Sequence, residues 1–155
     1  MQINLISVGS KMPIWVNEGF RDYQQRLRGD VGLHLSEIPL QKRLNKSQLR
    51  AAQEKETQEI LQRVGNGYVV TLDGGGQEYS SEELARRLAH WQENHRELAL
   101  IIGAPEGLSA EVKARAQESW SLGKLTLPHP LVRIVVAEAL YRAWTINQNH
   151  PYHRA

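Results

Sequence analysis

The chain contains no cysteine, and this absence limits both its chemistry and its surroundings. Without cysteine, disulfide bonds and thiolate metal sites are excluded, and a secreted, disulfide-stabilised domain has no support. Long apolar runs are missing too, because the run at residues 3–8 is too short for a signal-peptide core or a membrane span. We therefore expect a cytoplasmic protein.

The motifs of several large enzyme classes are absent as well. The chain has no G-x-x-x-x-G-K-[ST], and its first apolar run ends in VGSK and not in G-x-G-x-x-G. It contains neither the G-x-S-x-G of serine hydrolases nor the H-E-x-x-H of zinc proteases. These absences disfavour nucleotide hydrolases, dinucleotide-dependent enzymes and both hydrolase classes. Since His129, His150 and His153 lack a carboxylate with convincing ligand spacing, we expect no bound metal.

Positive charge is concentrated near the end of the chain. The formal net charge of all 155 residues is only +2, but residues 123–155 contain four Lys or Arg against one Glu. Three of the six histidines lie there as well and would add charge near an anionic partner. A plain surface bias explains the same distribution, so composition alone leaves both interpretations open.

Hydrophobic periodicity and turn residues predict strands that alternate with helices. The expected strands cover residues 2–9, 31–38, 68–72, 98–103 and 120–127. Helices are expected after Pro13, over residues 47–64 and 130–148, and after the capping residues Ser80 and Ser109. The run DGGG at residues 73–76 should end the third strand in a turn. This order predicts an α/β fold with a mostly parallel sheet, and 41% hydrophobic content fits a single domain over residues 1–155.

The last expected helix, at residues 130–148, is apolar on nearly every side. Only Arg133, Glu138 and Arg142 are charged before its end. A helix of this kind must be buried all round. One sheet covers one side, and a second subunit is the natural cover for the other, which predicts a homodimer. The alternative is a central core helix within a monomer.

Three loops follow expected strands and are candidates for a ligand site, since ligands of parallel sheets collect beyond the carboxyl ends of strands. They come after Leu72, after Ile102 and around residues 122–127. Gly103 and Gly123 would let a ligand approach the backbone. Glycines after strands also serve ordinary turns, so this signal is weak by itself.

The chain ends in NHPYHRA, at residues 149–155, and this composition is unusual for a terminus. Chain ends usually fray, yet this one carries imidazoles, a phenol and a guanidinium, which titrate, stack and bind phosphate. Nearby, Arg142 follows Glu138 by four residues, so a helix salt bridge competes with any contact between Arg142 and RNA.

Several segments together resemble the RlmH family, the ribosomal large-subunit pseudouridine N3-methyltransferases of the SPOUT class. The matching stretches are VG at 8–9, KMP at 11–13, IIGAPEGL at 101–108, SWSL at 119–122, LTLPHPLVR at 125–133, LYRAW at 140–144 and NHPYHR at 149–154. The resemblance spans essentially the whole chain. One departure is visible, because members often have GGPEG where this chain has GAPEG; the added methyl of Ala104 is small enough that we expect binding to survive.

The resemblance implies a fold, a cofactor and a substrate. The expected fold is a SPOUT-type α/β domain with a deep C-terminal trefoil knot, working as a homodimer. The expected reaction is methylation, with S-adenosylmethionine, of N3 of a pseudouridine in a 23S rRNA hairpin loop of the assembled ribosome. The cofactor would be bound by Leu72, Gly103, Ala104, Leu122, Gly123, Lys124, Leu125, Thr126 and Leu127. His129 and Arg142 would contact RNA.

The tail residues Tyr152, His153 and Arg154 are then the candidate catalytic residues. Methyl transfer from a sulfonium needs aligned reactants and removal of the imide proton, and no metal or protein nucleophile. His153 could take the proton, Tyr152 could stack on or hydrogen-bond the base, and Arg154 could neutralise the ionised base or bind a phosphate. The sequence does not decide which of the three removes the proton. A ribosome-binding protein of the same fold without catalysis is the alternative.

Overall fold

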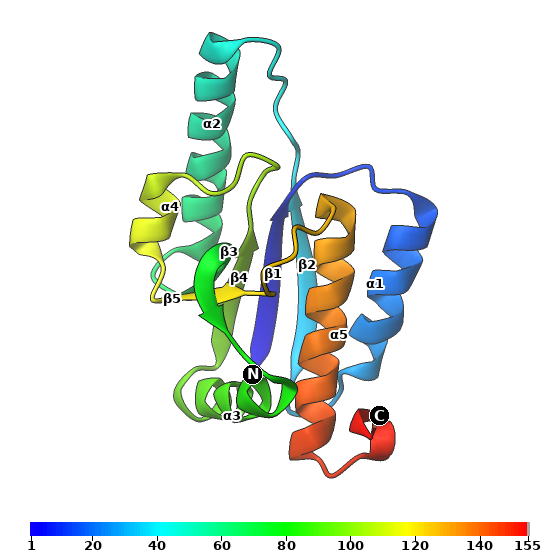
Figure 1. Cartoon of the computed structure of the whole chain (residues 1–155). Helices are drawn as coiled ribbons and strands as arrows, with labels where there is room; N and C mark the ends of the chain where they lie inside the picture. The colour runs from blue at the N-terminus through cyan, green and yellow to red at the C-terminus, as the bar shows by residue number, and fades with distance from the viewer. Residues whose placement is uncertain (155) are drawn as a thin grey trace.

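The computed structural model describes residues 1–154, and over this range it contains five strands, five α-helices and one 3₁₀-helix (Figure 1). Along the chain these are β1 (Gln2–Val8), α1 (Ile14–Arg26), β2 (Gly32–Ile38), α2 (Lys46–Val64), β3 (Tyr68–Glu78), α3 (Ser81–Asn94), β4 (Glu97–Ile102), α4 (Ala110–Arg115), β5 (Glu118–Ser121), α5 (His129–Asn147) and η1 (Pro151–His153). None of the helices in the described part of the chain is long and apolar enough to cross a membrane.

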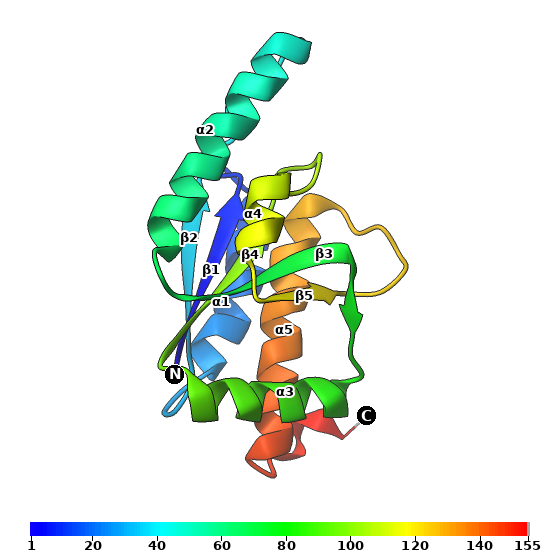
Figure 2. The same ribbon diagram turned by 90° about the vertical axis from the view of Figure 1, so that its left-hand side faces the viewer.

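The five strands form one sheet in the order β2-β1-β4-β3-β5, and every neighbouring pair is parallel. This confirms the predicted α/β class. Helices α2 and α4 cover one face of the sheet, and α1 and α5 cover the other (Figures 1 and 2). Parallel sheets are stable when both faces are covered in this way.

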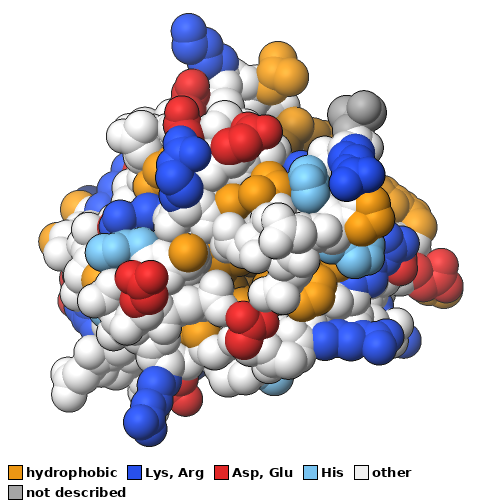
Figure 3. Space-filling model, turned by 90° about the horizontal axis from the view of Figure 1, so that it is seen from below, with side chains coloured by type: hydrophobic (Ala, Val, Ile, Leu, Met, Phe, Trp, Pro, Cys, Tyr) orange, Lys and Arg blue, Asp and Glu red, His pale blue; other side chains and the backbone are white. Residues whose placement is uncertain are grey.

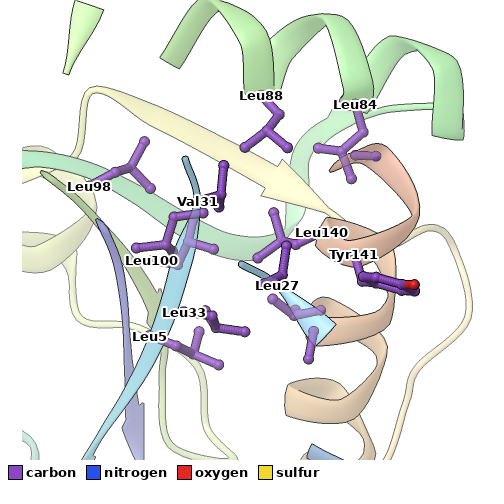
Figure 4. Close-up of a cluster of buried hydrophobic side chains, with 14 of the residues drawn as sticks. Leu5, Leu27, Val31, Leu33, Leu84, Leu88, Leu98, Leu100, Leu140 and Tyr141 are labelled. Carbon is purple, nitrogen blue, oxygen red and sulfur yellow. The ribbon is translucent and has the colours of Figure 1, made fainter. Parts of the chain in front are cut away.

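Strand β1 shows how the sequence builds the two-sided core. Ile3 and Leu5 are buried in the cluster that includes residues of α1, α3 and α5, part of which Figure 4 shows. Ile6 and Val8 are buried in a second cluster with residues of α2 and α4. Because successive side chains of a strand point to opposite faces, the apolar run at residues 3–8 serves both layers.

The local helix signals are confirmed. Ser80 and Glu83 form the predicted capping box at the start of α3. Ser109 caps α4 by accepting a hydrogen bond from the backbone N–H of Val112. Each cap satisfies backbone donors that the first turn of a helix leaves without a partner.

The predicted end of the third strand was wrong. Strand β3 does not stop at Leu72 but continues to Glu78, with a shift of register between Leu72 and Gln77 where it pairs with β5. A Cβ at Gly76 would lie 2.7 Å from atoms of Ser119. The glycine therefore permits a close approach of two strands, where the sequence alone suggested a turn.

The predicted extended segment at residues 120–127 was also partly wrong. Strand β5 ends at Ser121, and residues 122–127 form a loop. The Ser121 hydroxyl accepts a hydrogen bond from the backbone N–H of Gly123 at 3.1 Å, and Gly123 has a φ of +124°. This side-chain bond and the glycine conformation turn the chain away from the sheet. The trefoil knot remains a prediction.

Helix α5 packs against α1 and α3, but it is not buried on all sides within one chain. Its buried side includes Val136, Leu140 and Ala143. The opposite side is half-buried and carries a mainly apolar stripe, which consists of Leu131, Val135, Glu138, Ala139, Arg142 and Ile146. At the start of the neighbouring α1, Ile14 and Trp15 are 75% and 56% exposed.

Candidate functional site

A cleft of about 420 Å³ lies beside β3 and β5, where β3 changes register and β5 ends. Its walls are Leu72, Asp73 and Gly74 from β3, Trp120 and Ser121 from β5, the whole loop 122–127, and Val132 of α5. Seven of the nine predicted cofactor residues thus line one cavity: Leu72, Leu122, Gly123, Lys124, Leu125, Thr126 and Leu127. Its volume is in the range of cavities that hold small molecules.

The loop 122–127, which closes one side of this cleft, is open to a ligand. Leu125 is 83% exposed, although it is a large apolar side chain. Within residues 1–154, the backbone N–H groups of Lys124, Leu125 and Thr126 donate no hydrogen bond to the protein. Apolar surface beside unpaired backbone donors suits a flat heterocycle with acceptor atoms at its edge.

Asp73 is a cleft residue that sequence reasoning missed. One oxygen of its carboxylate lies 3.4 Å from Lys113 Nζ, and the other accepts a hydrogen bond from the backbone N–H of Gly75 at 3.3 Å. The carboxylate lines the cleft beside Gly74. Its position directly after Leu72 was the available signal, since polar groups at strand ends commonly contact ligands. A carboxylate here can accept hydrogen bonds from ribose hydroxyls or from an ammonium group.

The other two predicted cofactor residues lie elsewhere. Gly103 and Ala104 are buried in the loop after β4, beside a small cavity lined by residues of α2 and α4, and they do not line the cleft. A Cβ on Gly103 would come within 2.7 Å of Leu108 and 3.0 Å of the backbone of Gly107. The structure thus gives Gly103 a packing role within its own loop.

His129, a predicted RNA contact, is half-buried and hydrogen-bonded within the protein. Its Nε2 lies 2.7 Å from the carbonyl oxygen of Val8 and donates a hydrogen bond to it. Burial lowers the pKa of His129, and the charge of Arg133 adds to this, while the bond to Val8 opposes it. The imidazole is therefore neutral near pH 7, and only Nδ1 is left to contact RNA.

Arg133 binds the end of β1 and the turn after it, next to the carbonyl of Val8 that His129 binds. It is almost fully buried and donates hydrogen bonds to Glu37, to the Ser7 hydroxyl and to the Gly9 carbonyl. The ion pair with Glu37 has an N–O distance of 2.8 Å. Buried arginines require such partners, so Arg133 and His129 together fix the turn after β1 to the start of α5.

The tail is ordered by aromatic packing. The Tyr152 ring meets Tyr141 edge-on at 4.6 Å between centroids, and its hydroxyl donates to Glu138 Oε1 at 3.1 Å. His150 caps the 3₁₀-helix η1 by accepting a hydrogen bond from the backbone N–H of Tyr152. Burial, with contributions from Tyr23 and Glu138, raises the pKa of Tyr152 well above its ordinary value. The phenol therefore stays protonated at neutral pH.

The three predicted catalytic residues differ in exposure. Tyr152 and His153 are half-buried and Arg154 is exposed. His153 Nδ1 is buried without a hydrogen-bond partner among residues 1–154. Arg154 is thus available to an external phosphate or base, while Tyr152 is engaged in packing. Ala155, the last residue of the NHPYHRA segment, lies outside the described residues.

Arg142, the second predicted RNA contact, forms the competing salt bridge. Its Nη2 lies 2.8 Å from Glu138 Oε1, and its guanidinium also stands 5.2 Å from the centre of the Tyr152 ring. The hydrogen bond with Glu138 raises the pKa of Arg142 further. Arg142 therefore helps to seat the tail, and an RNA contact stays a prediction.

The tail and the cleft lie apart in the same chain. Loop 122–127 leads into the first turn of α5, whereas the tail packs on its second half (Figure 1). No residue of 149–154 lines the cleft. His129 and the tail histidines stand at opposite ends of α5, and within residues 1–154 no three His, Asp or Glu side chains are grouped as metal ligands.

Comparison with known proteins identifies close relatives. A family model described as a predicted SPOUT methyltransferase matches residues 1–153. A ribosomal RNA large subunit methyltransferase H from Dichelobacter nodosus is 66% identical over 156 aligned residues that cover all of both chains. A protein of the same name from Methylococcus capsulatus is 50% identical and covers 99% of this chain and 100% of its own length.

Two solved structures have a similar fold at low sequence identity. A probable methylase family protein from Haemophilus influenzae aligns with a TM-score of 0.59 and 14% identity, covering 99% of this chain and 70% of its own. A structure from work on 2-OH methylation of C/U34 on tRNA aligns with a TM-score of 0.51 and 18% identity, covering 96% and 98%. These likenesses support the fold alone.

Proposed function

The chain belongs to the SPOUT methyltransferase family, and from this premise we propose that it methylates N3 of a pseudouridine in 23S rRNA, with S-adenosylmethionine as donor. The substrate class rests on the full-length identity of 66% to a ribosomal RNA large subunit methyltransferase. It is accordingly an rRNA methyltransferase. The particular base, the hairpin loop and the assembled ribosome as substrate belong to the proposal and come from the resemblance of the motifs.

In this proposal, the cleft binds S-adenosylmethionine. The unpaired backbone donors of Lys124, Leu125 and Thr126 suit the acceptor nitrogens of adenine, and Asp73 suits the ribose hydroxyls or the amino group. Leu72 and Leu127 supply apolar contact. Bound there, S-adenosylmethionine supplies an electrophilic methyl group on a sulfonium. Gly103 and Ala104 would shape the neighbouring β4–α4 loop.

The tail would provide the proton chemistry. The N3–H of pseudouridine must lose its proton to a base as the N–CH₃ bond forms and the S–CH₃ bond breaks. Tyr152 keeps its proton at neutral pH because its pKa is raised, so we assign the proton to His153, whose Nδ1 has no hydrogen-bond partner among residues 1–154. Arg154 is exposed and can hold a phosphate or the charge on the base. Tyr152 then serves to position its two neighbours.

A homodimer would bring the tail and the cleft together. Since residues 149–154 do not line the cleft of their own chain, a complete site needs the tail of a second subunit. The half-buried stripe on α5 and the exposed Ile14 and Trp15 on α1 provide an apolar surface for that contact. A knotted C-terminal segment and cytoplasmic localisation complete the proposal.

Removal of residues 152–155 tests this function directly. The truncated chain should fold and bind S-adenosylmethionine in calorimetry, because the cleft lies upstream, while single-turnover methyl transfer to ribosomes should collapse even at saturating ribosome concentration. Wild-type protein is the control. A truncated chain whose rate recovers at saturation would show that the tail only aids binding, and a wild-type chain that binds ribosomes without methyl transfer would support the non-catalytic alternative.

A further inference from the structure

A basic arm projects from the body of the protein. It consists of residues 40–51, which connect β2 to α2 and form the first turns of α2, and it extends past the sheet and the other helices (Figures 1 and 2). Lys42, Lys46 and Arg50 are exposed on it. No Asp or Glu occurs between residues 39 and 53. The arm is thus a protruding surface of one charge sign.

The arm is held in a defined conformation at its base. Arg43 is mostly buried and pairs with Glu56 of α2 at 2.6 Å and with Glu106 of the β4–α4 loop at 3.3 Å. Glu56 also accepts a hydrogen bond from the backbone N–H of Gln41 at 2.8 Å. At the tip, Asn45 caps α2 through the backbone N–H of Gln48. These bonds fix the positions from which the cations project.

The charges of the arm disfavour the helix that carries them. The first turn of α2 contains no acidic residue, and Lys46 stands where the helix dipole is positive. Lys46 and Arg50 are four residues apart, which places like charges side by side. Leu44 is 73% exposed at the same tip. Since neither charge nor exposed leucine contributes to folding here, an external anionic partner explains the arrangement better than stability does.

The arm and the cofactor cleft lie at opposite flanks of the sheet. The arm follows the carboxyl end of β2, which is one edge strand, and the cleft lies beside β5, the other edge strand. Four strand spacings separate these edges, about 20 Å in a sheet of ordinary geometry. A partner that occupies the cleft side and the arm together must therefore extend over more than one nucleotide.

We infer that the arm binds the phosphate backbone of large-subunit rRNA outside the methylated nucleotide, with Lys42, Lys46 and Arg50 as the phosphate contacts. The inference rests on the proposed function for the identity of the RNA. It adds a second contact surface, distinct from the tail, that determines how tightly the ribosome is held. The buried Arg43 orients the arm and does not contact the RNA.

The test is a triple variant, Lys42→Gln with Lys46→Gln and Arg50→Gln. Its unfolding temperature, its S-adenosylmethionine affinity and its single-turnover rate at saturating ribosomes should match the wild type. The ribosome concentration for half-maximal rate should rise about tenfold or more, and the slope of log affinity against log salt should fall by about 2 to 3, since each lost phosphate contact removes about 0.9. Sedimentation with large subunits measures the same affinity without the reaction.

A matched variant, Arg28→Gln with Lys55→Gln and Arg96→Gln, changes the net charge equally at exposed sites outside the arm. It should shift ribosome affinity less than twofold. Equal losses of ribosome affinity in both triple variants would overturn the inference, because the change in net charge alone would then explain them. The inference would also be overturned if Leu44→Ser caused a large, salt-independent loss of ribosome affinity while the arm triple variant lost little. That result would favour a contact between the arm and a protein. If wild-type protein transfers no methyl group, the proposed function fails, while large-subunit binding still decides the role of the arm.

Discussion

Tyr152 shows how a residue near a chain end acquires a fixed role from its surroundings. Its ring packs on Tyr141, its hydroxyl binds Glu138, and Arg142 lies against its face. These contacts raise its pKa and hold it protonated, so they favour a positioning role. In the mechanism that we propose, Tyr152 therefore positions the tail, and its neighbours His153 and Arg154 act on the substrate.

This division predicts unequal effects of substitution in the tail. His153→Ala should lower the single-turnover methylation rate roughly 10²-fold or more, as expected for loss of a general base. Tyr152→Phe should keep the rate within about tenfold, because the aromatic packing remains and only the bond to Glu138 is lost, at about 1 kcal/mol of stability. Rapid-quench assays at saturating ribosomes measure both. A slower rate for Tyr152→Phe than for His153→Ala would reverse the assignment.

His129 predicts how stability responds to acid. Because burial lowers its folded-state pKa, the unfolded chain binds the proton more readily as the pH falls. The stability from neutral His129 is thus complete above the unfolded pKa of about 6.5 and decreases as the pH falls through the lower folded-state pKa. Thermal unfolding of wild type and His129→Gln between pH 8 and pH 5 should show a smaller decrease for the variant. Parallel curves would contradict this role of His129.

At the scale of elements, α5 connects the two halves of the proposed site. Its start follows the cleft loop, its buried side fills the core through Val136 and Leu140, and its second half seats the tail. On its half-buried stripe, Glu138 and Arg142 contact Tyr152 of the tail, whereas Leu131 and Val135 stay partly exposed to solvent. One side of α5 thus packs in the core of its own chain, and by our proposal the other side forms the dimer interface.

Two adjacent substitutions separate these roles. Val135→Glu places a charge on the half-buried stripe and should dissociate the dimer while the folded monomer survives. Val136→Glu buries the charge in the core and should cost several kcal/mol, enough to unfold the chain. Sedimentation and circular dichroism distinguish the two outcomes. A wild-type chain that is monomeric at micromolar concentration would refute the interface.

At the scale of the whole molecule, separation of the tail from the cleft is the main feature. The cleft loop precedes α5, the tail follows it, and the two do not meet in one chain. The two-subunit site that we propose would cover the part of the stripe at Leu131 and Val135 that the tail leaves open. In that proposal, the tail of one subunit would meet the cleft of another copy of the fold.

A mixing experiment tests the composite site. Arg154→Ala removes a tail function, and Gly123→Ala disturbs the cleft, because φ of +124° strains any residue other than glycine. Each homodimer should be nearly inactive, but random reassembly of an equal mixture should recover about a quarter of the wild-type activity, from one intact site per heterodimer. Gly75→Ala, at an open position without positive φ, is the control for glycine replacement. Absence of recovery after confirmed subunit exchange would indicate sites within single chains.

The sequence by itself determined the order of strands and helices and the caps at Ser80 and Ser109. These features depend on signals within a few residues, namely apolar periodicity, side-chain caps and strand ends. Only the tertiary structure decided that β3 continues past Leu72, because this depends on pairing with β5, a strand 40 or more residues further along.

The same limit applies to the site. The sequence grouped Gly103 and Ala104 with the cleft residues, and the structure places them in a neighbouring loop, while it adds Asp73 to the cleft. Whether His129 points to RNA or to the carbonyl of Val8 depends on contacts across 121 residues of sequence. Residue types define which chemistry is available to a chain, whereas long-range packing decides which of those groups meet, which are neutralised by burial and which stay open to a partner.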